Sequence, residues 1–140
     1  MRPHVFAVTL AVTDLETSLR FYRDGLGLPS DGIVGTEFAG DDEHPGGEAV
    51  MFTLDGGLVL SLYAASDLTK DAHVPRDAVA GHGFSIGHRV ETRAEVDALL
   101  DAAAAAGGTV TAPPHERPWG IYSGYFTDPD GHLWEVVCFD

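Results

Sequence analysis

A stretch of aromatic residues separated by glycines is the part of the sequence best suited to bind a small molecule. Residues 118–125 read Pro-Trp-Gly-Ile-Tyr-Ser-Gly-Tyr and include Trp119 and Tyr122. Flat aromatic side chains lose little conformational entropy on binding and stack well on planar ligands. A twisted strand whose aromatic residues cover a sheet edge or a subunit contact would carry the same pattern. Trp119 and Tyr122 are therefore candidate ligand contacts, with this structural alternative kept open.

Side chains that could bind a metal or act as nucleophiles lack the spacing that such sites need. The chain has seven histidines, and no two of them form a His-x-x-x-His pair. Cys138 is the one cysteine, which excludes an internal disulfide and a cysteine-rich zinc site. Nothing around it resembles a Cys–His nucleophile pair. The sequence also lacks the glycine-rich motifs that bind nucleotides.

The composition indicates one acidic globular domain. The 140 residues include 22 acidic and 8 basic side chains, the formal net charge is −14, and 44% of the residues are hydrophobic. Nucleic-acid binding needs clustered cations, and anionic membrane surfaces repel an acidic protein, so we expect neither partner. A cationic or neutral small molecule remains possible, although many soluble proteins are simply acidic. No apolar run could span a membrane and no signal-peptide pattern is present, so we expect a cytoplasmic protein.

The first half of the chain predicts a strand, a helix and three further strands. Alternating apolar residues over 5–12 indicate a strand, and Asp14 can cap the helix that follows. Gly25 and Gly27 can end that helix. The turn Asp55-Gly56-Gly57 predicts a hairpin. The three strands expected after the helix are residues 28–36, 49–54 and 58–63, with an acidic loop at 38–47.

The second half predicts the same order of elements. Thr92, with Glu95 three residues later, forms a capping box for a helix with a buried stripe. The turn Asp128-Pro129-Asp130-Gly131 predicts a second hairpin. The strands expected here are residues 84–90, 109–112, 121–127 and 132–139. The aromatic residues expected in the core of the two halves are Phe21, Tyr22, Phe52, Phe84, Phe126 and Trp134.

Two constant offsets relate the halves as an internal repeat. Pairs such as Val12/Val90 and Phe21/Leu99 differ by 78 positions, and pairs such as Phe52/Phe126 differ by 74. The change in offset falls where the first half has its acidic loop. Neither half has enough residues to bury its apolar face alone, so we expect the two to pack as a pair.

Two motifs give the chain a resemblance to a known superfamily. The segment Val12 to Leu28 (VTDLETSLRFYRDGLGL) and the segment Thr127 to Val136 (TDPDGHLWEV) resemble the vicinal oxygen chelate superfamily, which includes glyoxalase I, extradiol dioxygenases, fosfomycin-resistance transferases and bleomycin-resistance proteins. The resemblance implies an α+β fold of two βαβββ modules, whose mixed sheets curl around a cavity, and a homodimer. We expect a single domain over 1–140, with modules at 1–64 and 83–140 and a connector at 65–82.

The resemblance also locates the positions at which metal-dependent members carry histidine or glutamate. These positions are Ala7, Ser61, Ser85 and Glu135 in this sequence. A methyl group, two hydroxyls and one carboxylate make a poor divalent-metal site, which needs about three strong donors. We therefore expect no metal or other cofactor, without excluding a divalent ion. Ala7, Ser61, Ser85 and Glu135 are candidate ligand-binding residues.

Glu135 is the one carboxylate that the resemblance places in the cavity. It could act as a general base with a raised pKa, contact a cationic ligand, or simply hydrogen-bond to Ser61 or Ser85. The favoured function is metal-independent binding of a small cationic or aromatic molecule, similar to the bleomycin-resistance branch. The alternative is a lyase, isomerase or dioxygenase of the same superfamily that uses Glu135 with an atypical or absent metal site. Whether the protein is an enzyme stays open at this point.

Overall fold

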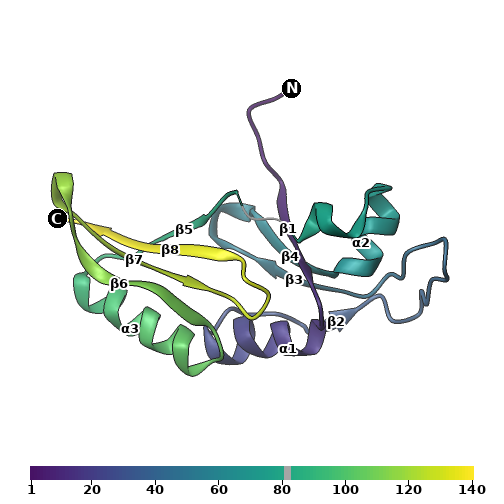
Figure 1. The fold of residues 1–140 in the computed structure, drawn as a ribbon, viewed down its shortest axis with the longest axis horizontal. Coiled ribbons are helices and arrows are strands. Elements are labelled where there is room, and N and C mark those ends of the chain that lie inside the picture. Colours follow the sequence, from purple (N-terminus) through teal and green to yellow (C-terminus); the bar gives the residue numbers. More distant parts are fainter. Residues whose placement is uncertain (81–82) are drawn as a thin grey trace. The chain divides into compact units, whose positions relative to one another are not determined.

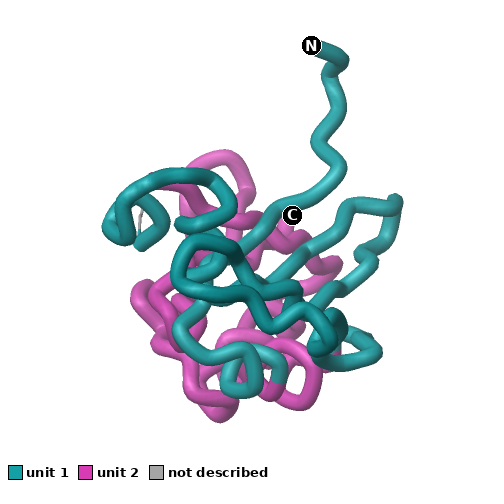
Figure 2. The backbone as a smooth tube through the Cα atoms, turned by 90° about the vertical axis from the view of Figure 1, so that its right-hand side faces the viewer, with its two compact units in different colours: residues 1–19, 28–81 teal, residues 20–27, 82–140 magenta. Residues whose placement is uncertain are grey.

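The computed structural model of the chain describes residues 1–80 and 83–140. Residues 81 and 82, where the connector is expected to end, lie outside the described residues. The chain divides into two compact units (Figure 2). The first unit comprises residues 1–19 and 28–81, and the second comprises residues 20–27 and 82–140. No helix in 1–80 or 83–140 combines the length and the apolar character needed to cross a membrane.

The first unit contains a four-stranded mixed sheet. Its order is β1-β4-β3-β2, in which β1 and β4 are parallel and the other neighbours are antiparallel. The predicted turn at Asp55–Gly57 joins β3 to β4 as expected. The strands are β1 (Ala7–Val12), β2 (Ile33–Val34), β3 (Ala49–Thr53) and β4 (Val59–Ala64), as labelled in Figure 1.

Helix α1 (Leu15–Leu19) follows β1 and begins as the sequence predicts. The side chain of Asp14 accepts a hydrogen bond from the Thr17 amide at 2.8 Å, which satisfies a free donor at the helix start. Alternate residues of the sheet point into the core of this unit. The largest buried apolar residues here are Leu10, Val12, Leu15, Leu19, Val50, Phe52, Leu60 and Leu62.

Two segments of the first unit differ from the expectation. The strand expected over 28–36 is reduced to the two residues of β2. The connector, whose sequence shows no clear period, contains helix α2 (Ala65–Ala72) and the short helical turn η3 (Arg76–Val79). No residue of α2 is fully buried, and Leu68 is its single large apolar residue, so the helix gives a weak signal to sequence-based prediction.

The second unit repeats the topology of the first. Its sheet has the order β5-β8-β7-β6, with β5 and β8 parallel and the other neighbours antiparallel. Both sheets are mixed and open, so the predicted α+β fold of two βαβββ modules is confirmed. The strands are β5 (Ile86–Arg89), β6 (Thr109–Arg117), β7 (Ile121–Thr127) and β8 (Leu133–Phe139).

Helix α3 (Arg93–Ala105) packs against one face of this sheet (Figure 1). The predicted capping box is present, because Thr92 accepts a hydrogen bond from the Glu95 amide and the Glu95 carboxylate accepts one from the Thr92 amide. A Cβ at Gly124 of β7 would lie 2.8 Å from the backbone oxygen of Ala112 on β6, which cannot move aside as the end of a side chain can. Glycine is therefore required at this contact.

Two predictions for the second unit are wrong. The strand expected at 109–112 continues as β6 to Arg117, through Pro113 and Pro114. Prolines donate no hydrogen bond, and β6 tolerates them because it is the edge strand and its register shifts there. Phe84 is expected in the core but is 57% exposed, because β5 begins only at Ile86.

A buried hydrogen-bond network joins residues 20–27 to the rest of the second unit. The turns of η1 (Arg20–Gly25) bury Phe21 and Tyr22. The Tyr22 hydroxyl donates to the Asp128 carboxylate at 2.6 Å and accepts from the Trp134 indole at 3.1 Å. The other Asp128 oxygen accepts from the amides of Asp130 and His132, each at 2.9 Å. Both oxygens of this carboxylate thus accept hydrogen bonds from within the second unit.

Replacing Tyr22 by phenylalanine tests this network. We expect Tyr22→Phe to lower the free energy of unfolding by about 1–3 kcal/mol, because a buried carboxylate loses a hydrogen bond. Urea denaturation measures the loss. Tyr125→Phe is the matched control, since its hydroxyl makes no hydrogen bond with the described residues, and it should cost less than about 0.5 kcal/mol. Equal effects of the two substitutions would contradict the assignment.

The same tyrosine predicts a loss of stability at alkaline pH. Burial, and after it the charge of Asp128, raise the pKa of Tyr22 well above its ordinary value of 10.0. Above pH 10 the unfolded chain therefore loses this proton while the folded protein keeps it, so stability falls as the pH rises. We expect the wild-type protein to lose up to about 1.4 kcal/mol per pH unit more than Tyr22→Phe does above pH 10. Parallel stability–pH curves for the two proteins would refute this.

Candidate functional site

The second sheet divides its side chains between two faces. Trp134, Val136 and Cys138 of β8 are buried on the face that packs against α3 and η1. The intervening residues Leu133, Glu135, Val137 and Phe139 point to the opposite face, because side chains alternate along a strand. We call this opposite face the far face. By register it also carries alternate residues of β5, β6 and β7, namely Gly87, Arg89, His115, Arg117, Ile121, Ser123, Tyr125 and Thr127.

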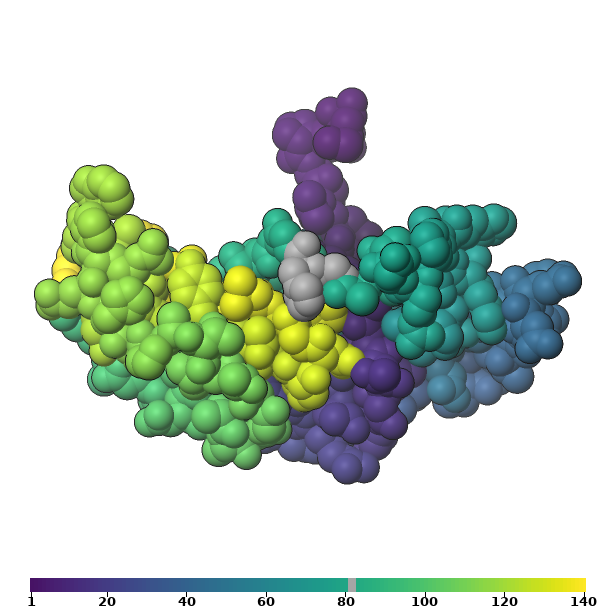
Figure 3. Space-filling model, in the orientation of Figure 1, coloured from purple at the N-terminus to yellow at the C-terminus, as the bar shows by residue number. Residues whose placement is uncertain are grey.

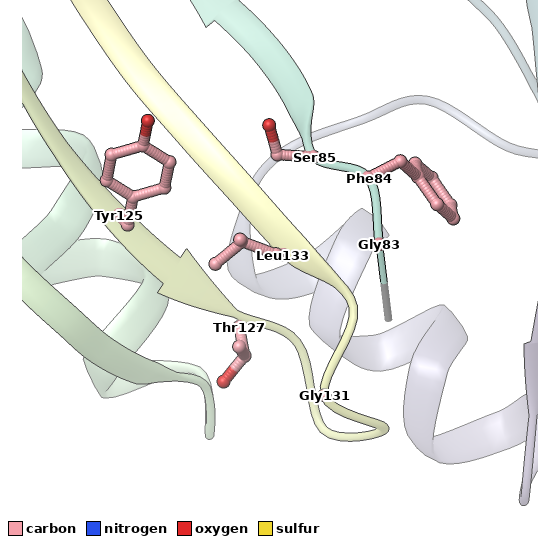
Figure 4. Close-up of a pocket in the computed structure, with 7 residues that line it drawn as sticks. All are labelled: Gly83, Phe84, Ser85, Tyr125, Thr127, Gly131 and Leu133. Atoms are coloured by element: carbon pink, nitrogen blue, oxygen red, sulfur yellow. The ribbon is translucent and has the colours of Figure 1, made fainter. Parts of the chain in front are cut away.

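A hollow of about 580 Å³ lies at one end of the far face. Its lining residues come from β7, β8 and the segment before β5, and they are Gly83, Phe84, Ser85, Tyr125, Thr127, Gly131 and Leu133. In Figure 4 the hydroxyls of Tyr125 and Ser85 point to the same side, with Leu133 between them, and the ring of Phe84 points away. The hollow therefore offers an apolar floor with hydroxyl groups beside it.

Glu135 lies next to this hollow on the far face. Its Cα is paired with Tyr125 on β7 and with Gly87 on β5. Its side chain is 24% exposed, and its Oε1 is 3.3 Å from Nη1 of Arg117. The same Arg117 nitrogen donates to the Ser123 hydroxyl at 3.4 Å. Glu135 is thus half-buried and engaged by a guanidinium group.

The other end of the far face carries a second arginine. The Arg89 guanidinium carbon lies 5.1 Å from the centre of the Phe139 ring, a distance at which a cation and an aromatic face attract each other. Within residues 1–80 and 83–140, Arg89 makes no ion pair or side-chain hydrogen bond. The Arg89 guanidinium could therefore bind an anionic group on this face.

The structure distributes the sequence-predicted site residues over both units. Ser85 and Glu135 lie on the far face of the second sheet. Ala7 and Ser61 belong to the first unit, where the pairing of Thr9 with Ser61 places them on one face of the β1–β4 pair. Ser61 is buried and Ala7 is half-buried. Each unit therefore supplies two of the four positions.

Trp119 and Tyr122 lie apart from Glu135. Trp119 is 91% exposed in the turn between β6 and β7, which stands out at the upper left of Figure 3. Tyr122 faces α3, where its hydroxyl donates to Asp97 at 2.6 Å and its ring lies 4.9 Å from the guanidinium carbon of Arg93. Asp97, through this hydrogen bond, raises the pKa of Tyr122 above its ordinary value. Ligand binding by these two aromatic residues stays a prediction.

Tyr125, Leu133 and the contact of Arg117 with Glu135 are parts of the site that the sequence analysis does not single out. Their signal is nonetheless present in the hairpin. The turn Asp128–Gly131 fixes the register of β7 and β8, so Tyr125 must lie opposite Glu135. Leu133 lies two residues before Glu135 on β8, so the alternation of side chains places it on the same face. The reach of Arg117 from β6 across β7 to Glu135 on β8 has no such signal.

The residues at the family's metal positions do not fit a divalent metal. They provide a methyl group, two hydroxyls and one carboxylate, and that carboxylate contacts Arg117. Divalent transition metals in proteins need about three strong nitrogen, oxygen or sulfur donors. In the part of the chain that the structure describes, no three His, Cys, Asp or Glu residues are grouped closely enough to hold one.

Comparisons with known proteins agree with this fold. Residues 4–136 match the family profile described as the Glyoxalase/Bleomycin resistance protein/Dioxygenase superfamily. A glyoxalase-related enzyme from Fulvimarina pelagi is 29% identical, covering 97% of this chain and 88% of its own, with a TM-score of 0.80. An Agrobacterium tumefaciens protein is 26% identical, covering 98% of both chains, with a TM-score of 0.72. No protein of curated function matches the chain significantly.

The donor set predicts that the purified protein carries no stoichiometric transition metal. We expect elemental analysis of protein prepared without chelators or metal-affinity steps to find less than about one tenth of an equivalent of zinc, iron, manganese, nickel or copper. The melting temperature should be the same with and without EDTA. One equivalent of any of these metals, removed by EDTA with a drop in melting temperature, would contradict the prediction.

Proposed function

Because the chain belongs to the Glyoxalase/Bleomycin resistance protein/Dioxygenase superfamily, we propose that it binds a small aromatic molecule, without a metal, on the far face of its second sheet. The single observation that carries the proposal is the hollow beside Glu135. The superfamily hosts several chemistries, so the site itself must decide among them. The donor set at the metal positions argues for binding that needs no metal.

The lining of the hollow suits a flat ligand. Tyr125 and Leu133 offer apolar surface on neighbouring strands, and Ser85 offers a hydroxyl group at its border. Small-molecule sites typically combine such apolar surface with a few polar groups that fix orientation. An aromatic ring stacked on Tyr125 would gain about 0.5–1.5 kcal/mol beyond the apolar area that it buries.

The contact between Arg117 and Glu135 weighs against the two other functions that the sequence allows. A cationic ligand would have to compete with Arg117 for the carboxylate. An enzymatic role for Glu135 as a general base would require the substrate to displace the same guanidinium. Neither function has an observation of its own in its favour, so binding of an aromatic group is the function we propose.

A titration with indole, a neutral planar molecule, tests the proposal. We expect saturable chemical-shift changes in ¹⁵N-labelled protein at Ser85, Tyr125 and Leu133, unchanged by EDTA. Tyr125→Ala should weaken binding about fivefold, which corresponds to about 1 kcal/mol of lost stacking. Phe139→Ala, at the other end of the far face, is the matched control and should leave the affinity unchanged.

Three outcomes of this titration would overturn the proposal. They are shifts that do not saturate, shifts confined to the exposed turn that carries Trp119, and an affinity that appears only when a divalent metal is added. Equal loss of affinity in Tyr125→Ala and Phe139→Ala would also contradict it, because the binding surface would then not be the hollow.

A further inference from the structure

We infer that the ligand of the far face carries a carboxylate or a similar anionic oxygen group, which Arg117 binds. This inference rests on the proposed function and names the class of molecule that the site takes. Three observations support it: the hydrogen bonds that hold Arg117, the charged side chains on the far face, and the position of Glu135 beside the hollow.

Within residues 1–80 and 83–140, Arg117 is held through one of its three nitrogens. It lies on the edge strand β6 opposite Ile121, and its side chain crosses β7 to reach Glu135 on β8. Nη1 makes both of its contacts, 3.3 Å to Glu135 and 3.4 Å to Ser123. Within the described residues, Nη2 and Nε make no hydrogen bond. Charge-assisted hydrogen bonds of arginine are usually about 2.7–2.9 Å. The longer contact with Glu135 therefore orients the guanidinium group and leaves its other nitrogens able to bind a ligand.

The unused edge of the guanidinium has the geometry of an acid receptor. Nε and Nη2 form a planar fork that binds both oxygens of a carboxylate at once. The side chain of Arg117 is 40% exposed, so the fork is open to solvent yet partly shielded by the protein. Its contacts with Ser123 and Glu135 limit rotation of the group, which reduces the entropy that binding must offset.

The local charge of the far face is opposite to that of the whole chain. The strands of this sheet place two arginines, Arg89 and Arg117, and one carboxylate, Glu135, on this face. The chain as a whole has a formal net charge of −14. Among the side chains that these strands place on the far face, the two arginines therefore outnumber the one carboxylate. The expectation of a cationic ligand follows from the net charge, whereas the far face favours an anionic group.

The hollow lies close along β8 to Glu135, the residue that Arg117 contacts. Leu133 in the hollow and Glu135 at Arg117 are two residues apart on β8, a separation of about 7 Å. A molecule with an aromatic ring at one end and an acid at the other spans such a distance. An aryl-substituted short-chain acid, such as 3-phenylpropionate, is the simplest member of this class.

Three ligands that share a phenyl ring and a short chain and differ in the charge of their polar end group test the inference on the full chain. They are 3-phenylpropionate, 3-phenylpropanamide and 3-phenylpropylammonium, with dissociation constants from NMR titration at low salt. We expect the acid to bind at least tenfold more tightly than the amide, and the ammonium to bind most weakly. The preference for the acid should shrink as sodium chloride is added.

Two substitutions of Arg117 test whether its guanidinium group causes the preference for the acid. Arg117→Gln should abolish the difference between acid and amide, and Arg117→Lys should keep part of it, because lysine retains the charge but loses the fork. Arg76→Gln is the matched control, since it removes the same charge from an exposed turn of the first unit and should leave the preference unchanged. Superposable amide spectra would show that the variants are folded.

The outcomes separate this inference from the proposed function. If indole and the amide bind as tightly as the acid, the proposed function stands and the anionic group is overturned. A preference for the acid that survives in Arg117→Gln, or a preference for the ammonium, also overturns it. If the three phenyl compounds and indole all fail to bind, the proposed function fails as well.

Discussion

The buried carboxylate of Asp128 is the constraint on which the second unit depends. It sits in the turn between β7 and β8 and accepts hydrogen bonds from Tyr22, Asp130 and His132. Burying a charge is costly unless hydrogen bonds compensate for it, so these three donors must stay in place together. The turn then has one conformation, and it fixes the register of the hairpin that carries Tyr125, Leu133 and Glu135.

The alternation of side chains lets one sheet serve two purposes. Residues facing α3 and η1 pack into an aromatic core, in which the rings of Phe126 and Trp134 stack at 6.0 Å. The residues between them on the same strands face away from that core and form the hollow and the arginine site. Because each strand serves both faces, a change of register by one residue would place Glu135 in the core and Trp134 on the far face.

The sequence predicts well the features that local patterns encode. The capping box at Thr92, the hairpin turns and the alternation of β8 depend on residues close in the chain, and the structure has them all. The helix α2 and the length of β6 are missed, since the first has Leu68 as its single large apolar residue and the second contains prolines that normally interrupt a strand. The contact of Arg117 with Glu135 joins residues 18 positions apart on strands that are not neighbours, so no local pattern reports it.

The prolines of β6 also affect how this protein behaves at high concentration. An edge strand exposes unpaired amides and carbonyls, which can recruit a strand from another molecule and start aggregation. Successive amides of a strand point to opposite edges, so one of the adjacent residues Pro113 and Pro114 removes an outward-facing amide. The shifts in register between Val110 and His115 also interrupt the regular spacing that an incoming strand would need. The second sheet therefore ends in a strand that is poorly suited to further extension, beside the face on which we propose that a ligand binds.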